Sequence, residues 1–489
     1  MQFNSFVFIL MFLPITVLAY FLANKWKPVL GKLVLAVASV VFYVYSDWTL
    51  FTVLGISLVV NLAFSWALQR LRPRGCLLLI VPVLINVGLL LYFKYTNFLI
   101  GTVNQFAGTA WAVRDLVQPL GISFFTFQQI AYLVSVYKGE IDRVAPLDYL
   151  CYILYFPKIL MGPLMDPADF LGQLNDPRRK QVNMDHLANG LQIFSFGLFK
   201  KVMLADVFAK GVSWGFSNLG SATAMDLLLV TLFYTFEIYF DFSGYSDMAV
   251  GVSQMLNITL PINFDSPYKA LSIRDFWKRW HISLTKFFTK YVYIPLGGSR
   301  KGQVRTYLNT VLIFLISGLW HGANFTFILW GLLHGGFMVL DRIFGKAQEK
   351  VFEPVRWFVT FCILNVLWLL FRAGSIGQWI SILKTILLMQ DTSISDGLIR
   401  CFTLPEMPFL VNMLPIERLQ AIRGFWMILY VLFAMGICLI PENNYKNLEK
   451  RSICRMLLAA VAFVWGFICL SSESVFVYFN LAHCKMNLQ

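Results

Sequence analysis

Long apolar stretches separated by short polar segments dominate the chain. They cover residues 3–23, 33–45, 51–68, 76–93 and 187–199, among others. Crossing the roughly 30 Å of membrane hydrocarbon takes about 20 apolar residues in a helix. Several stretches are shorter, and we expect these to be tilted, re-entrant or interfacial pieces that other helices shield from lipid. The pattern predicts an all-α multi-pass membrane protein with about 11–13 helices.

We expect one integrated membrane domain over residues 1–489, because no fixed-period repeat and no inverted pair of broken helices interrupts the pattern. The first 20 residues lack a basic start and a small-residue cleavage site, so they predict a retained helix rather than a signal peptide. Two polar stretches, 166–183 and 390–424, are expected to form loops with short helical turns, the second at a membrane face.

Composition agrees with a membrane protein, since 58% of the residues are hydrophobic and 13% are charged, against about 25% charged in a soluble domain. The net charge is +14, but the basic residues lie in short loops beside apolar segments, as expected of cytoplasmic flanks that contact anionic lipid. We therefore expect no nucleic acid partner. The predicted cytoplasmic flanks are Lys25, Lys27, Lys32, Arg178, Arg179, Lys180, Lys446, Lys450, Arg451 and Arg455.

The eight cysteines predict neither a disulfide framework nor a metal site. Most lie within apolar segments, and none forms a Cys-x-x-Cys pair or a Cys/His cluster with metal-ligand spacing. We expect no bound cofactor and no metal.

Residues 269–305 differ from the rest, because nine basic residues are opposed there only by Asp275. Aromatic and aliphatic side chains recur every three or four residues from Phe276 to Tyr291, which predicts one amphipathic helix ending before Pro295. We interpret 269–305 as a basic platform at the membrane interface.

His321 is the strongest candidate for chemistry. It lies in apolar sequence from 311 to 333, and an ionisable group at such a position usually faces a cavity or a partner. Burial favours the neutral imidazole, which can accept a proton as a general base. Gly318 and Gly322 flank it at a spacing of four residues. They either let a substrate approach the imidazole or let another helix pack closely, and the sequence leaves both open.

Three further polar residues accompany His321. His281 lies within the basic platform, where it serves either the chemistry or a bond to a carbonyl or lipid phosphate. Glu237 and Asp241 are four residues apart, so a helix would place both carboxylates on one face. We expect these carboxylates to orient an imidazole or to neutralise the platform. His334 is expected to be an orienting or packing residue.

The chain resembles the membrane-bound O-acyltransferases, and in particular the bacterial branch of alginate-type polysaccharide O-acetyltransferases. The resemblance covers most of the chain, through long ordered motifs rich in tryptophan and glycine. The motifs span residues 239–249 (YFDFSGYSDMA), 263–268 (NFDSPY), 274–284 (RDFWKRWHISL), 291–298 (YVYIPLGG) and 318–324 (GLWHGAN).

The resemblance implies helices around a central funnel in the bacterial cytoplasmic membrane, with His321 as the catalytic base and His281 as the second family position. It implies acetyl transfer from cytoplasmic acetyl-CoA, or another acyl thioester, to a hydroxyl of an extracytoplasmic polysaccharide or of a secreted or anchored relay transferase. Together with this donor, the platform predicts that Lys278, Arg279, Arg300 and Lys301 bind its phosphates, with lipid headgroups as the alternative ligand.

Two other functions remain open from the sequence. A sister branch that transfers D-alanine toward teichoic acid shares the paired histidines and the funnel. A transporter or flippase would also use intramembrane polar residues such as Glu237, Asp241 and His321.

Overall fold

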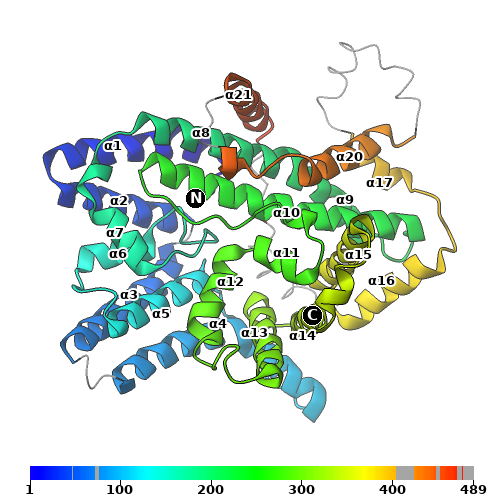
Figure 1. Cartoon of the computed structure of the whole chain (residues 1–489), viewed down its shortest axis with the longest axis horizontal. Coiled ribbons are helices and arrows are strands. Elements are labelled where there is room, and N and C mark those ends of the chain that lie inside the picture. The colour runs from blue at the N-terminus through cyan, green and yellow to red at the C-terminus, as the bar shows by residue number, and fades with distance from the viewer. Residues whose placement is uncertain (47, 72–75, 404–422, 448–451, 471–475, 477–489) are drawn as a thin grey trace.

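The structure is a computed structural model, which describes the chain apart from residues 47, 72–75, 404–422, 448–451, 471–475 and 477–489 (Figure 1). Its described part is helical, without a strand beyond one isolated antiparallel bridge between Phe264 and Trp280. Six described helices are long and apolar enough to cross a membrane, and four shorter ones are also apolar. The all-α multi-pass fold is thus confirmed.

The amino-terminal helices follow the apolar stretches of the sequence. They are α1 (Leu13–Trp26), α2 (Pro28–Val44), α3 (Trp48–Arg70), α4 (Cys76–Ala107), α5 (Ile122–Lys138), α6 (Pro146–Leu154) and α7 (Pro167–Asn175). Proline stands in the first turn of α2, α6 and α7, where its missing N–H costs no helical bond. With a 3-10 turn at Pro177–Lys180, α7 confirms short helical turns in the polar stretch 166–183.

The middle of the chain forms α8 (Met184–Phe199), α9 (Asp206–Ser217), α10 (Ala224–Met255), α11 (Ile273–Arg279) and α12 (Ile282–Phe288). Helix α10 runs through the centre of the molecule, between the blue amino-terminal helices and the yellow helices of the later chain (Figure 1). A capping box of Thr223 and Asp226 begins it, and nearly all of its side chains are buried.

Glycines join α10 to α8, which lies beside it in Figure 1. Gly190 faces Gly251 and Gly197 faces Gly244, seven residues apart on each helix. A β-carbon on Gly197 would lie 2.7 Å from the Gly244 carbonyl oxygen, and one on Gly244 would lie 2.8 Å from that of Gly197. The two backbones therefore approach as closely as small-residue packing in membranes allows.

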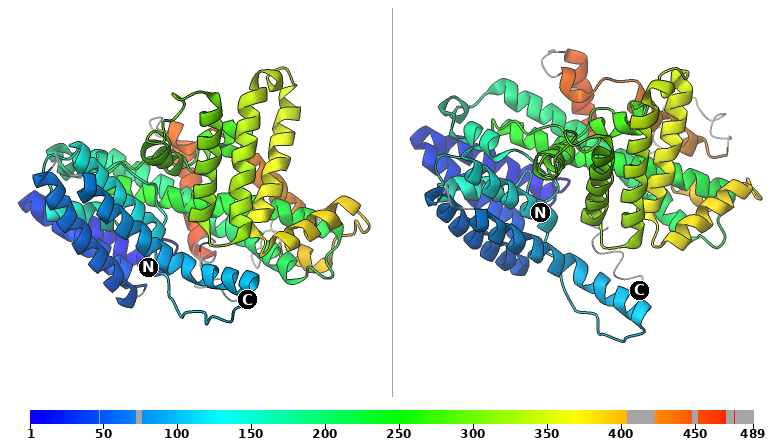
Figure 2. Two further views of the ribbon diagram at one scale, coloured as in Figure 1. Left: turned by 90° about the horizontal axis from the view of Figure 1, so that it is seen from below. Right: turned by 60° about the horizontal axis from the view of Figure 1, so that its bottom comes forward.

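The later helices are α13 (Gln303–His321), α14 (Phe325–Gln348), α15 (Glu353–Arg372), α16 (Ile376–Leu388), α17 (Asp396–Arg400), α20 (Phe425–Leu439) and α21 (Ile453–Ile468). Both views of Figure 2 show α13, α14 and α15 side by side, on the other side of the molecule from the amino-terminal helices. In the predicted loop 390–424, α17 is a short helical turn, whereas the segment with Pro405, Pro408 and Pro415 lies outside the described residues.

The single amphipathic helix predicted from Phe276 to Tyr291 is wrong, because the helix breaks at His281. The backbone of residues 263–265 pairs with the chain at the break, where Asp265 N–H donates to the Arg279 carbonyl (2.9 Å) and Ile282 N–H donates to the Asn263 carbonyl (3.0 Å). His281 adopts a left-handed conformation with φ of 44°. Most of the apolar stripe, including Phe276 and Leu284, is buried inside the protein.

We predict that Gly244→Ala lowers the melting temperature, because the new methyl group meets backbone atoms of α8 that cannot move aside singly. Thermal unfolding in detergent measures the effect, expected to be several degrees. Gly336→Ala is the matched control, since Gly336 lies in α14 with open space around its missing β-carbon. An equal loss of stability in both variants would contradict close α8–α10 packing.

Candidate active site

His321 is the last residue of α13, at a bend in the chain. Gly322 follows in an extended conformation, and the Asn324 side chain caps α14 by accepting a hydrogen bond from Thr326 N–H (2.9 Å). The imidazole therefore lies where the helix ends, and the apolar run 311–333 is divided between two helices. The polar group is placed at a turn between them.

The glycines around His321 serve close helix packing, one of the two interpretations left open by the sequence. A β-carbon on Gly318 would collide with the carbonyl oxygen of Phe327, and one on Gly322 with the ring of Phe327. Helix α14 thus fills the space that these glycines leave.

Two polar side chains of α4 bind the backbone immediately before His321. Lys94 Nζ donates to the carbonyl of Trp320, and Tyr95 O–H donates to the carbonyl of Leu319. Lys94 also donates to Ser123 Oγ at 3.3 Å. The last carbonyls of a helix have no partner within it, and a cation at this end also complements the helix dipole.

A hollow of about 500 Å³ opens beside His321. The carboxyl-terminal half of α4, residues 321–325 and residues 374–376 line it, and Lys94 and Asn97 contribute polar groups to the wall. His321 is half-buried there, and its ring meets those of Trp330 and Phe371 edge-on at centroid distances of 5.3 and 5.2 Å. His321 thus lies in the wall of the hollow, and aromatic rings pack against its imidazole.

The structure brings His281 and His321 together around Trp320. The Trp320 ring lies 4.9 Å from the His321 ring and 6.2 Å from the His281 ring, measured between centroids. His281 is 1% exposed and packs edge-on against Phe242 at 4.7 Å. Its Nε2 is buried without a hydrogen-bond partner among the described residues.

A second hollow, of about 590 Å³, lies on the other side of this aromatic group. Residues of α5, α7 and α12 line it, including Phe127, whose ring stacks on Trp320 at 5.5 Å and on Phe287 at 4.4 Å. Trp320 therefore lies between His321, in the wall of the first hollow, and Phe127, in the wall of the second. We call Trp320 and Phe127 the aromatic wall.

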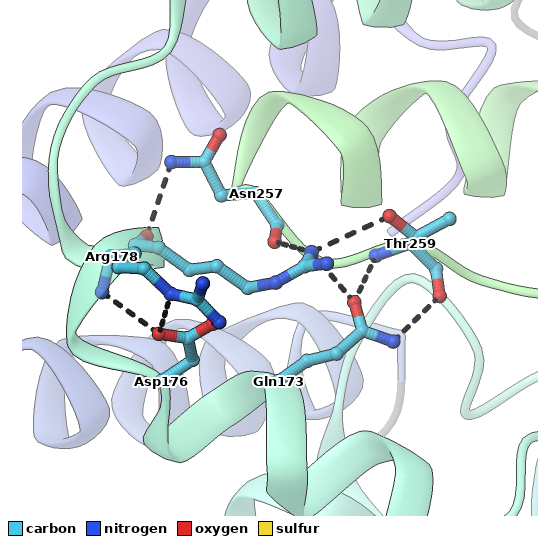
Figure 3. A network of polar contacts seen from close by, with 6 residues as sticks. Gln173, Asp176, Arg178, Asn257 and Thr259 are labelled. Carbon is cyan, nitrogen blue, oxygen red and sulfur yellow. Dashed lines mark hydrogen bonds and ion pairs between the residues drawn. The ribbon is translucent and has the colours of Figure 1, made fainter.

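Basic and acidic residues both line the second hollow, and protein acceptors already hold some of the basic ones. Lys290 pairs with Asp166 (2.6 Å) and with Glu140 (3.2 Å). Arg179 donates to Gln173 Oε1 and to the Asn257 carbonyl, both at 2.8 Å, within the network that Figure 3 shows. Lys286 also lines the hollow.

The same network extends into the exposed loop after α7. Arg178 pairs there with Asp176 at 3.0 Å, and this hydrogen-bonded guanidinium lowers the pKa of the Asp176 carboxyl (Figure 3). Side chains of this segment therefore hold the start of the predicted flank Arg178–Lys180, of which Arg179 lines the second hollow.

The four residues predicted to bind the donor do not line either of the two hollows in the described structure. Arg279 pairs with Asp275 at 3.0 Å, whereas Lys278, Arg300 and Lys301 are exposed. Their contact with a donor stays a prediction. Lys286 and Lys290 of the same platform reach the second hollow instead.

The two carboxylates of α10 lie in the protein core. Asp241 forms an ion pair with Lys201 at 2.7 Å, and both side chains are almost fully buried. Glu237 is 6% exposed, and its Oε2 has no hydrogen-bond partner among the described residues. Asp241 therefore shares Lys201 with Asp206, which pairs with the same lysine at 2.9 Å, and its expected role toward an imidazole stays a prediction.

His334 packs among aromatic rings of α11, α13, α14 and α15. Trp277 Nε1 donates to its Nδ1 at 3.2 Å, so the single proton of the neutral ring is on Nε2. The side chain is fully buried. The packing role expected of His334 agrees with these contacts.

Sequence reasoning missed Lys94, Tyr95, Phe127 and Trp320. Lys94 carried a usable signal, because a lone lysine directly follows the apolar run 76–93 and an intramembrane cation marks a candidate site. The aromatic residues carried none, since the chain contains 46 phenylalanines and 14 tryptophans. Within the described residues, no group of three or more His, Cys, Asp or Glu side chains is placed to hold a metal ion.

Comparison with known proteins places these features in a family context. The sequence model of the membrane-bound O-acyltransferase family matches residues 7–382. The peptidoglycan O-acetyltransferase of Helicobacter pylori is 36% identical over 98% of this chain and 97% of its own. A probable alginate O-acetylase of Pseudomonas aeruginosa is 36% identical over 77% of this chain and 73% of its own. The teichoic acid D-alanyltransferase of Bacillus subtilis is 30% identical over 48% of this chain and 62% of its own.

We predict that diethyl pyrocarbonate, which acylates neutral imidazole, modifies His321 in the folded protein but spares His281 and His334. His321 faces a hollow, whereas the other two side chains are at most 1% exposed. Peptide mass spectrometry after brief treatment in detergent locates the adducts. Half-buried His186 serves as a reactive control, and unfolding should make all four reactive. Modification of His281 as readily as His321 before unfolding would contradict this arrangement.

Proposed function

Since the chain belongs to the membrane-bound O-acyltransferase family and is an acyltransferase, we propose that it moves an acetyl group from a cytoplasmic thioester to a hydroxyl outside the cytoplasm. The bacterial cytoplasmic membrane is the proposed location. The observation that carries this proposal is the position of His321. It lines the first hollow, and its ring contacts Trp320, whose ring stacks on Phe127 in the wall of the second hollow. Two reactants approaching through these hollows would meet beside one imidazole.

The chemistry follows from a neutral imidazole in an apolar surround. A nitrogen of His321 accepts the hydroxyl proton as the hydroxyl oxygen forms a bond to the acetyl carbonyl carbon. The carbon–sulfur bond then breaks, and the leaving thiolate takes the proton from the imidazolium to become a thiol. His281, close to Trp320, is proposed to position the donor or the acceptor at the wall.

The thioester is assigned to the second hollow because of the charges around it. Lys32, a predicted cytoplasmic flank, is bound to Asp148 and Asn175 near the end of α7, and Arg179 of another flank lines the hollow. Cytoplasmic loops carry the excess of lysine and arginine. Lys286 adds a positive charge that would attract the phosphates of a coenzyme A or phosphopantetheine donor.

The acceptor is proposed to be a hydroxyl of a cell-wall or secreted glycan, reached directly or through a secreted or anchored relay transferase. Peptidoglycan is the first candidate, because the match to the Helicobacter pylori peptidoglycan O-acetyltransferase extends over nearly the full length of both chains. The resemblance to the alginate O-acetylases covers about three quarters of the chain. D-alanyl transfer is the alternative, supported by a match over about half of the chain.

Replacing His321 tests the mechanism. We predict that His321→Ala folds and inserts but loses acetyl transfer by at least about a hundredfold, the lower end of the usual contribution of a general base. The measurement is the acetyl content of the glycan by mass spectrometry, in cells carrying the variant in place of the parent chain.

His186→Ala is the matched control, because His186 is bonded to Asn257 at 3.0 Å and lies outside the wall of either hollow. It should keep parental acetylation. Undiminished acetylation by a well-inserted His321→Ala variant would show that His321 is not the base.

The donor is tested separately with isolated membranes. Labelled acetyl-CoA should label the glycan or a relay protein, whereas a labelled D-alanyl carrier protein should not. Incorporation from the D-alanyl carrier alone would assign the chain to the alternative reaction.

A further inference from the structure

Gln128 of α5 is a polar side chain in the wall of the second hollow for which the proposed chemistry has no use so far. It is 1% exposed, and its Oε1 accepts a hydrogen bond from Lys158 Nζ. Its Nε2 is buried without a hydrogen-bond partner among the described residues. Buried polar atoms usually have a hydrogen-bond partner, so the unpartnered amide nitrogen of Gln128 requires an explanation.

Lys158 determines which way the amide faces. Lys158 Nζ donates to the oxygen of the Gln128 amide, so this bond places the oxygen on the side of Lys158. The nitrogen and its two N–H groups are therefore held away from Lys158.

Besides Gln128, the contacts of Lys158 are with aromatic rings. Lys158 is fully buried, and among the described residues no carboxylate lies within ion-pair distance of its Nζ. Its Nζ lies over the Tyr152 ring at 3.8 Å and near the Phe170 ring at 5.4 Å. Tyr152 also lines the second hollow, and its hydroxyl is fixed by a bond to the Met165 carbonyl (2.9 Å).

The neighbouring glutamine shows the contrast. Gln129 Nε2 is also buried without a hydrogen-bond partner among the described residues, but its Oε1 accepts from Ser57 (2.8 Å) and Asn61 (3.0 Å) of α3. Unlike Gln128, Gln129 does not line either of the two hollows. Its amide joins two membrane helices. Gln128, on another face of α5, instead contributes to the wall of the hollow beside Phe127 of the aromatic wall.

We propose that Gln128, oriented by Lys158, donates a hydrogen bond to a carbonyl oxygen of the acyl-thioester donor in the second hollow. A pantetheine arm presents such oxygens in its two amides and in the thioester itself. This inference rests on the proposed function, because it assumes that the thioester enters by this hollow. It adds a residue that binds the donor in the second hollow, next to Phe127 of the aromatic wall.

The test is donor binding by the purified protein in a His321→Ala background, where no turnover consumes the ligand. Isothermal titration compares acetyl-CoA with S-ethyl-CoA, a thioether that lacks only the thioester carbonyl. We expect Gln128→Met to weaken acetyl-CoA binding about three- to tenfold, the usual effect of losing one hydrogen bond. Gln128→Glu, which can pair with Lys158 but has no donor left, should weaken binding at least as much.

Gln129→Met is the matched control. It removes the adjacent buried amide and its bonds to α3, so it should lower the melting temperature while the affinity for acetyl-CoA stays within twofold of the parent. A loss by Gln128→Met confined to acetyl-CoA assigns the bond to the thioester carbonyl, whereas a loss with both ligands assigns it to an amide of the arm.

Two results would overturn the inference, and they differ. Unchanged binding of both ligands by folded Gln128→Met and Gln128→Glu would remove Gln128 from the donor site and leave the proposed function intact. No binding of either ligand by the parent protein, together with no acetyl transfer from acetyl-CoA in membranes, would overturn the proposed donor and this inference with it.

Discussion

The carbonyl groups at the end of α13 are the constraint on which the site depends. A helix leaves its last carbonyls without internal partners, and inside a membrane protein water is scarce, so side chains must supply the donors. Lys94 and Tyr95 of α4 supply two of them. Because α14 packs onto Gly318 and Gly322 from another side, the bend that carries His321 is held from two directions. The imidazole faces the first hollow as a result.

The sequence predicted those parts that depend on residue type alone. Apolar length and composition gave the all-α membrane fold, and a histidine inside apolar sequence indicated His321, which the structure places in the wall of a hollow. The resemblance to the family added His281, and both rings lie close to Trp320. Lys94 was visible by the same reasoning as His321 and was overlooked because it stands at the end of its apolar run.

The parts that depend on a distant partner could not be predicted. The helix break at His281 arises from backbone pairing with residues 263–265, which no local periodicity reveals. The expected donor site at Lys278 and Arg279 followed net charge, but pairing with Asp275 and surface position decide where those charges lie. Gln128 and Gln129 are identical neighbours in the sequence, and only the helices facing them give one to the hollow and the other to α3.

The aromatic wall also bears on how the membrane holds its ion gradients. Two polar hollows that joined through water would conduct protons, and the cell would lose the electrochemical potential that drives its transport and ATP synthesis. Stacked rings of Trp320 and Phe127 offer carbon faces to such a path, so they oppose a continuous file of water between the hollows. In the proposed reaction, the acyl group would be transferred beside these two rings without opening that path. The tryptophan that contacts the proposed base would then also help to keep the two hollows apart.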